Sequence, residues 1–164
     1  MNSYQRALDT LSATPSMLTA IVTSAPNDAL SLRPSPEEWS VQEVIAHLLH
    51  VETAVIAPRI RQMLEHDDPI LDSAGPPEKA GDLTAALEAW RKARADNLAF
   101  LRPLSSTQQQ RTGRHSKYGR ISVEEHVVEL AYHDLDHLRQ ILKAIQAEIY
   151  GEIGVFQALY PRPF

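Results

Sequence analysis

Apolar residues recur every three or four positions along four stretches of the chain, which is the period of one face of an α-helix. These stretches cover residues 3–24, 40–66, 82–101 and 122–147. No segment shows the alternation of apolar and polar residues that is typical of a half-buried strand. The pattern therefore predicts four long helices and no convincing strand.

Capping motifs mark the start of two of these helices. The segments SVQE and SVEE are capping boxes, with Ser40 and Ser122 as N-caps and with Glu43 and Glu125 at the N3 positions. In each box the serine hydroxyl and the glutamate carboxylate bind backbone N–H groups that would otherwise lack a partner. The second helix is therefore predicted to begin at Ser40 and the fourth at Ser122.

Proline and aspartate set further helix boundaries. Asp82 is the predicted N-cap of the third helix, and Pro103 ends that helix. Pro15 lies inside the first helical stretch and predicts a kink or an early break, whereas Pro58 predicts a bend in the second helix. The last residues, 151–164, are expected to form a short helix or an extended arm.

Four helices of this length predict an all-α fold, a four-helix bundle with long crossover loops in a single domain that spans residues 1–164. The loops 67–81 and 104–120 are long enough to cross the length of a bundle. The first of them would allow the second and third helices to run parallel, unlike neighbours in a simple up-down bundle.

Charge and composition exclude several classes of protein. The net charge is −5, and no run of Lys and Arg indicates a nucleic-acid interface. No apolar stretch reaches the roughly 18 residues of a membrane span, and the segment MNSYQRALDT lacks the features of a signal peptide. The chain has no cysteine, which excludes disulfides, thiolate ligands and a cysteine nucleophile and fits a cytoplasmic protein. Any metal ion would therefore be held by His, Asp or Glu.

The candidate chemistry lies in the histidines. His133 and His137 are four residues apart in the segment AYHDLDHLRQI, so on a helix both rings lie on one face, one turn apart. With 7 histidines in 164 residues, such a pair arises easily by chance. The pair alone is more typical of ordinary residues at the edge of a packed face, and a metal site needs a third ligand from elsewhere.

Helical phase supplies a candidate third ligand. At about 100° per residue, His126, His133 and His137 fall within about 40° of one another and border the apolar stripe of the fourth helix. His47 borders the stripe of the second helix in the same way. Counted from the caps, His47, His133 and His137 lie about 10, 16 and 22 Å along their helices, which fits antiparallel packing of these two helices. Three converging imidazoles with water in the remaining positions form a catalytic type of metal site.

Several polar residues keep more than one interpretation. Glu52 falls inside the apolar arc of the second helix, where a carboxylate is costly to bury unless it is paired, lines a cavity or lies where the helix has bent. His126 is either a neighbour of the site or an ordinary helix-face residue. Solvated positions are expected for His50 and His66, and roles as core anchors are expected for Trp39 and Trp90.

Two longer motifs resemble a known family. The segment W-S-V-Q-E-V-I-A-H, residues 39–47, resembles the start of helix two in the DinB-like (YfiT-related) metalloprotein superfamily. The segment G-R-I-S-V-E-E-H-V-V-E-L-A-Y-H-D-L-D-H-L-R-Q-I, residues 119–141, resembles the last core helix of that superfamily. The resemblance implies a four-helix bundle with one divalent metal ion held by His47, His133 and His137.

The resemblance also implies roles for two other residues. The position of Glu52 is often acidic in relatives, so Glu52 is the candidate catalytic base beside the metal. His115 lies in a segment that resembles a loop closing over such sites, which makes it a candidate cofactor-binding residue. A set of three nitrogen ligands suits Zn, Ni, Cu or Fe, and Zn or Ni is the first expectation.

Characterised relatives include enzymes that transfer low-molecular-weight thiols such as bacillithiol or mycothiol. The resemblance therefore implies a metal-dependent thiol S-transferase acting on a small-molecule substrate, with the metal ion lowering the pKa of the thiol. A metal-dependent hydrolase, in which Glu52 would act as the base, and a non-catalytic metal-binding protein of a stress response are the alternatives. Homodimers are common among relatives, so a homodimer is expected, with neither nucleic acid nor membrane as a partner.

Overall fold

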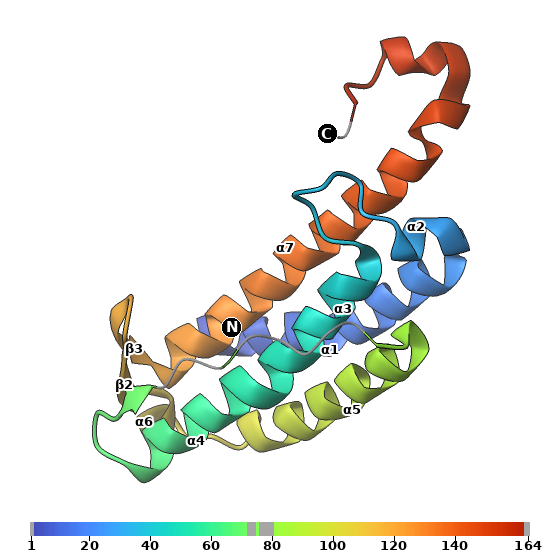
Figure 1. Ribbon diagram of the computed structural model, residues 1–164. Helices are drawn as coiled ribbons and strands as arrows, with labels where there is room; N and C mark the ends of the chain where they lie inside the picture. The colour runs from blue at the N-terminus through green and yellow to red at the C-terminus, as the bar shows by residue number, and fades with distance from the viewer. Residues whose placement is uncertain (1, 72–74, 76–80, 163–164) are drawn as a thin grey trace.

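Four long helical segments pack side by side and form the predicted four-helix bundle (Figure 1). The computed structural model describes residues 2–71, 75 and 81–162. The long segments are α1 (Ser3–Ser24), α3 (Val41–His50) continuing through the π-helix η1 (Val51–Ile56) into α4 (Ala57–Glu65), α5 (Leu83–Leu101) and α7 (Val123–Ile149). The short helices are α2 (Asn27–Ser31), α6 (Ser106–Gln109) and the 3-10 helix η2 (Tyr150–Ala158).

Local sequence sets where the helices begin. Both predicted capping boxes form: the hydroxyl of Ser40 accepts from the Glu43 N–H at 3.2 Å, and Glu43 Oε2 accepts from the Ser40 N–H at 2.9 Å. The corresponding bonds between Ser122 and Glu125 measure 3.1 and 2.7 Å. The side chain of Asp82 accepts from a first-turn N–H of α5 at 2.8 Å. These short-range bonds fix the axial position of every residue that follows on α3, α5 and α7.

Pro15 lies within α1, and the helix continues through it. Proline lacks the N–H that would bind the carbonyl of Leu11, four residues earlier. That carbonyl instead accepts hydrogen bonds from the hydroxyl of Thr14 and from the guanidinium of Arg94 on α5, both at 3.3 Å. α1 does not end at Pro15 because a donor from another helix replaces the missing one.

Pro58 changes the helix in a different way. The π-helical segment η1 precedes it, and Pro58 lies in the first turn of α4. In an α-helix the carbonyl of Ala54 would press against the proline ring, and a wider turn relieves that clash. The bend predicted near Pro58 thus takes the form of a π-helical segment, and Glu52 lies within it.

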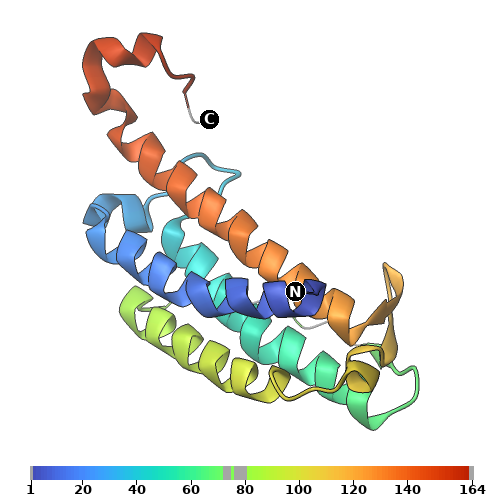
Figure 2. The same ribbon diagram turned by 180° about the vertical axis from the view of Figure 1, so that it is seen from behind.

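The chain direction divides the bundle into two parallel pairs. Ser3 donates to Glu124, and Thr14 Oγ1 donates to Asp134 Oδ2 at 2.7 Å, so α1 and α7 run parallel. Figures 1 and 2 show α3–α4 and α5 running side by side in the direction opposite to α1 and α7. The parallel course of the second and third long helices and the antiparallel course of α3 and α7 both agree with the sequence prediction.

A small sheet at one end of the bundle was not predicted. Its strands are β1 (Ile70–Leu71), β2 (Thr112–His115) and β3 (Gly119–Ser122), in the order β1-β2-β3, with β1 parallel and β3 antiparallel to β2. The prediction that the chain has no strand was wrong here, because strands of two to four residues are too short to show alternation.

Gly113 explains how the sheet packs on the bundle. A Cβ atom at this position would lie 2.8 Å from Leu71 Cδ2 and 2.9 Å from Met63 Cγ. Only glycine therefore allows β2 to approach β1 and α4 this closely. The approach brings the β2–β3 hairpin beside the N-terminal part of α7 (Figure 1).

Two apolar clusters fill the interior. One cluster lies towards the hairpin end of the bundle and the other towards the start of α3. Along α1, α5 and α7, the residues of the buried polar network described below lie between the two clusters. Trp90 is fully buried in the second cluster, as expected of a core anchor. The largest fully buried apolar side chains are Leu8, Leu11, Leu18, Ile45, Leu48, Ile56, Ile60, Met63, Leu71, Trp90 and Leu101.

The C-terminal end of α7 and the short helix η2 extend beyond the other helices (Figure 1). Several apolar side chains of this segment are exposed, among them Val155 and Tyr160. The predicted short helix is present. In the described part of the chain, no helix combines the length and the apolar character needed to cross a membrane.

Candidate metal centre

Three histidines from two antiparallel helices converge on one point. His47 projects from α3, and His133 and His137 project from successive turns of α7. The Nε2 atom of His133 lies 3.2 Å from that of His47 and 3.1 Å from that of His137. One ring nitrogen from each histidine lies within 4.8 Å of the other two. Such spacings match roughly the 3–3.5 Å expected between ligands of one tetrahedral ion with bonds of about 2.0–2.1 Å.

The protonation of two of the three rings suits metal binding. Burial and, after it, the neighbouring rings of His137 and His133 lower the pKa of His47 to about 4. Burial and the His137 ring likewise lower the pKa of His133 to about 4. Both imidazoles are therefore neutral at pH 7, and a neutral imidazole has the lone pair that a metal ion needs.

A glutamine orients the third ring. The side-chain oxygen of Gln140 lies 2.9 Å from Nδ1 of His137, so Nδ1 carries the proton and Nε2 presents a lone pair towards the other two histidines. Each of the three Nε2 atoms presents either a lone pair or an N–H group, so at least two of them present the same kind of group towards the shared point. A divalent cation removes this conflict, so the residues present fit the metal ion that the sequence implies.

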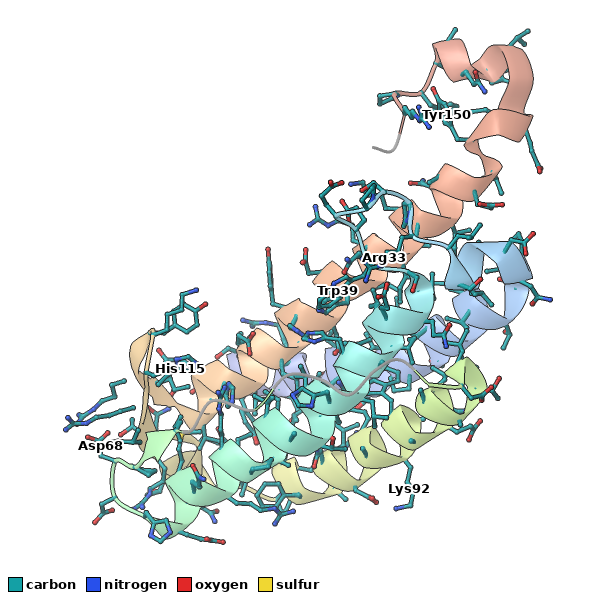
Figure 3. The ribbon with its side chains drawn as sticks, in the orientation of Figure 1. Arg33, Trp39, Asp68, Lys92, His115 and Tyr150 are labelled. Atoms are coloured by element: carbon teal, nitrogen blue, oxygen red, sulfur yellow. The ribbon has the colours of Figure 1, made fainter. Side chains whose placement is uncertain are left out.

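Trp39 packs against two of the three rings. Its ring centroid lies 4.9 Å from that of His47, and it stacks on His137 at 6.1 Å with an interplanar angle of 5°. Figure 3 shows Trp39 between the start of α3 and α7. Trp39 was expected to be a core anchor rather than part of a ligand site; it packs against the core and also contacts the centre. The sequence signal for this contact was the position of Trp39 directly before Ser40, the N-cap of the helix that carries His47.

Beneath the histidines lies a buried network of charges. Arg94 of α5 donates to Glu52 with Nε at 3.0 Å and Nη2 at 2.7 Å, and to Asp134 with Nη1 at 2.5 Å and Nη2 at 3.0 Å. All three side chains are at most 1% exposed. Thr14 donates to Asp134, and Asn97 donates to Glu52 at 2.9 Å. The network therefore joins α1, η1, α5 and α7 at the level of the metal centre.

The charge state of the network follows from its geometry. Burial by itself lowers the pKa of Arg94, but the hydrogen bonds and charges of Asp134 and Glu52 outweigh it and raise the pKa above its ordinary value. Arg94 is therefore a permanent cation. Sequence reasoning missed Arg94, Asn97 and Asp134, although Arg94 and Asn97 interrupt the apolar stripe of α5 and could have indicated a polar interior.

Glu52 belongs to this network. Of the alternatives that the sequence left open for this carboxylate, the structure therefore shows the paired one. Both of its carboxylate oxygens are engaged by Arg94 and Asn97. The catalytic role of Glu52 stays a prediction, and this geometry favours a structural role.

A cavity of about 570 Å³ adjoins the metal centre, and His133 forms part of its wall. Side chains from η1, α4, the β2–β3 hairpin and the first half of α7 complete the wall. They are Val51, Val55, Ile56, Arg59, His115, Tyr118, Ile121, Glu125, His126 and Glu129. The three-histidine group therefore adjoins a cavity whose surface is mainly apolar.

His115 lines the cavity, and Figure 3 shows it on the β2–β3 hairpin beside the N-terminal part of α7. Its Nδ1 accepts hydrogen bonds from the N–H groups of Lys117 and Tyr118 at 3.1 and 3.4 Å, so Nε2 carries the proton. Burial, together with the charges of Arg59 and Lys117, lowers the pKa of His115. The structure places His115 near the site but outside the three-histidine group, so its cofactor-binding role stays a prediction.

Residues 10–141 match the DinB superfamily. The chain belongs to this superfamily. No protein of curated function matches the sequence significantly.

Two solved structures resemble this DinB-superfamily protein. One is YfiT from Bacillus subtilis, described as a probable metal-dependent hydrolase with an unusual four-helix bundle topology. It has 19% sequence identity and a TM-score of 0.75, over 86% of this chain and 85% of YfiT. The other is TT2238, a four-helix bundle protein, with 22% identity and a TM-score of 0.66 over 85% of this chain and 98% of TT2238. At these identities the likeness shows the shared fold.

The depressed histidine pKa values predict that this DinB-superfamily protein is sensitive to mild acid when no metal is bound. His47, His126 and His133 have a folded-state pKa of about 4, against about 6.5 in an unfolded chain. The unfolded state therefore binds more protons between these values, and stability falls as the pH decreases from 6.5 towards 4. Carboxylates with a depressed pKa, such as Glu43 at about 2, act mainly below that window.

Thermal melts in chelator at pH 7.5, 6.0 and 5.0 would measure this effect. The melting temperature is expected to fall steadily, and a His126→Gln variant should show a shallower fall because one of the three groups is gone. A melting temperature that stays constant across this range would contradict the prediction.

Proposed function

We propose that this protein is a metal-dependent enzyme that acts on a small molecule bound in the cavity beside the three histidines. One observation carries the proposal: the Nε2 atoms of His47, His133 and His137 converge, and His133 also lines a cavity large enough for a small ligand. Ligand sites of proteins are typically cavities of about 300–1,000 Å³ with mainly apolar walls and a few polar groups.

The number of ligands favours a catalytic site over a structural one. A structural zinc site is normally closed by four protein ligands, whereas a catalytic site has three and leaves a position for water or substrate. Among the described residues, the candidate group has three members, and Glu52 is engaged elsewhere. An ion held there would keep an open position towards the cavity. The number of ligands does not support the alternative of a non-catalytic metal-binding protein of a stress response.

The first candidate reaction is the transfer of a low-molecular-weight thiol to an electrophilic small molecule. The ion, when bound, would supply the charge that favours the thiolate form of the incoming thiol. Because the chain has no cysteine, the nucleophilic sulfur must come from the cosubstrate. A new sulfur–carbon bond would form, the bond from that carbon to its leaving group would break, and the thiol proton would pass to solvent. The aliphatic wall of the cavity would keep water away from the thiolate.

The second candidate is metal-dependent hydrolysis of a small ester or amide. The likeness of the fold to YfiT, a probable metal-dependent hydrolase, favours this reaction. Here the ion would favour the ionised form of water. His115 lines the cavity and carries its proton on Nε2, so this N–H group could donate a hydrogen bond to the leaving group.

The two reactions separate in one experiment on protein loaded with Zn²⁺ or Ni²⁺. One arm contains bacillithiol, mycothiol or glutathione with monochlorobimane, and the other contains a 4-nitrophenyl ester without thiol. Activity in the first arm supports the transferase, and activity in the second supports the hydrolase. In either case the rate should fall at least a hundredfold after chelation and in His133→Ala. An activity that survives both changes would refute the proposal.

The predicted homodimer, like the small-molecule partner and the cytoplasmic location, stays a prediction. One face of α7 would suit a second copy. Val128, Leu135, Leu142 and Ile149 are exposed at intervals of seven residues, which is the repeat of a coiled-coil seam. In an antiparallel pair of α7 helices, Leu135 would face Leu142 of the second copy.

A further inference from the structure

Glu129 of α7 is an accessible carboxylate on the wall of the cavity that His133 also lines. Its side chain is 58% exposed, so a molecule in the cavity can touch it. Among the described residues, no hydrogen bond holds its carboxylate, and its Oε2 atom lies 3.7 Å from Nδ1 of His126. Glu129 is therefore free to exchange a proton with a bound molecule.

The position of Glu129 on α7 places it beside the metal centre. It precedes His133 by four residues, so the two side chains share one face of the helix, with Cβ atoms roughly 5–6 Å apart. Because both side chains line the cavity, a small molecule bound against His133 lies next to Glu129 as well. Glu129 is not a member of the three-histidine group, so its carboxylate is not taken up as a ligand of that group.

The other carboxylates near the histidines are already bound by protein groups. Glu125 also lines the cavity, but its Oε2 atom accepts from the N–H and the hydroxyl of Ser122 at 2.7 and 2.8 Å. Glu52 does not line the cavity, and its buried carboxylate is paired with Arg94. Of the carboxylates on the described part of the cavity wall, Glu129 is thus the one that can act without breaking a helix cap.

The surroundings of Glu129 strengthen it as a base. Loss of hydration raises its pKa, the charge of Arg59 opposes this shift, and the charge of Asp134 adds to it. Burial lowers the pKa of His126 to about 4, so this neighbour is neutral at pH 7. A base whose pKa lies closer to the working pH is more effective in catalysis. The charged and titratable groups around Glu129 are Arg59 on α4, His115 on β2, and Glu125, His126, His133 and Asp134 on α7.

We propose that Glu129 is the catalytic base of this site and accepts the proton that the nucleophile loses. In thiol transfer the S–H proton passes to Glu129, the sulfur forms a bond to carbon, and the leaving group departs with its electron pair. The exposed carboxylate then releases the proton to solvent. In hydrolysis an O–H proton of water passes to Glu129, and Glu129 returns it to the departing oxygen or nitrogen. This inference rests on the proposed function, because a base is required only if the site is catalytic.

The variant Glu129→Gln tests this role, because glutamine keeps the shape of the side chain but accepts no proton at neutral pH. In whichever assay is active, thiol transfer or ester hydrolysis, kcat of the Zn²⁺-loaded variant should fall roughly a hundredfold while KM stays within about threefold. Zn²⁺ affinity, measured by calorimetric titration, should also stay within about threefold. The control Glu148→Gln removes an exposed carboxylate of the same helix outside this cavity and should behave like wild type.

Two further measurements separate proton transfer from a structural role. Glu129→Ala leaves space for a small carboxylate, so formate should raise kcat of this variant at least about tenfold and should not accelerate the wild type or Glu148→Ala. The second measurement needs no turnover: carbon NMR of metal-free protein with ¹³C-labelled glutamate carboxyls. The resonance that is missing from Glu129→Gln should titrate above the ordinary value of about 4.3.

Four results would overturn the inference while the proposed function stands: a fall in kcat below about tenfold in Glu129→Gln, a Zn²⁺ affinity reduced more than tenfold in that variant, no rescue of Glu129→Ala by formate, or a Glu129 carboxyl that titrates at or below about 4.3. A failure of the proposed function looks different. Zn²⁺-loaded wild type that is inactive in both assays would refute the proposed function, and the catalytic role of Glu129 with it.

Discussion

Replacing His133 by alanine is expected to abolish metal binding while the bundle remains folded. His133 is the central ring of the three, because its Nε2 lies within 3.2 Å of both of the others. Loss of a residue that only orients a ligand already lowers metal affinity about 10–100-fold, so loss of the central ligand should cost more than a hundredfold. The fold should persist because Val127, Leu138 and Ile141 still bury α7, and each such side chain contributes about 1.5–3 kcal/mol.

Calorimetric titration with Zn²⁺ or Ni²⁺ and thermal melts followed by circular dichroism would check both parts. A metal concentration a hundredfold above Kd stabilises the wild type by about 2.7 kcal/mol, or roughly 5–10 °C in melting temperature. Chelator should remove this increment from the wild type and from a His66→Ala control, and should leave His133→Ala unchanged. If the chelated wild type loses its helical signal at 25 °C, the ion has a structural role and the enzyme proposal loses its main support.

Replacing Arg94 by methionine should cause the largest loss of stability of any change considered for this protein. Methionine fills a similar volume but leaves Glu52 and Asp134 as two buried carboxylates without a counter-charge. Removing one partner of a buried ion pair typically costs about 3–5 kcal/mol. It also leaves the carbonyl of Leu11 beside Pro15 with one donor fewer. We therefore expect a decrease of about 3–5 kcal/mol in the free energy of unfolding.

Urea denaturation of Arg94→Met would measure this decrease. The control is Lys92→Met on the same helix, whose side chain is 81% exposed, and it should change stability by no more than about 0.5 kcal/mol. A combined variant, Arg94→Met with Glu52→Gln and Asp134→Asn, should recover much of the loss because no unpaired charge remains buried. A cost below about 1 kcal/mol for Arg94→Met would show that water or rearrangement compensates for the missing cation.

The sequence determined the features that depend on short-range geometry. The capping boxes at Ser40 and Ser122 involve residues three apart, so their hydrogen bonds follow from the local chain alone. Once the helix starts are fixed, a period of 3.6 residues sets the direction of His47, His133 and His137. These two facts, with the family resemblance, were enough to predict the bundle and the histidines that converge.

Tertiary structure decided the features that depend on residues far apart in the chain. The phase of α5 shows that Arg94 points inwards, but its partners on η1 and α7 follow from how the helices pack. The β2–β3 hairpin needs pairing along its length and close packing at Gly113, and neither leaves a periodic signal in four residues.

The same limit applies to the site. Helical phase placed His126 close to the metal ligands, but only the packed structure shows that it lines the cavity and that its buried Nε2 has no hydrogen-bond partner. The contacts of Trp39 with the histidine rings and the ion pair of Glu52 with Arg94 of α5 likewise depend on how separate helices pack. Local propensity and spacing act within one helix, whereas cavities and buried ion pairs arise from the contacts between helices, which the sequence specifies only through the complete fold.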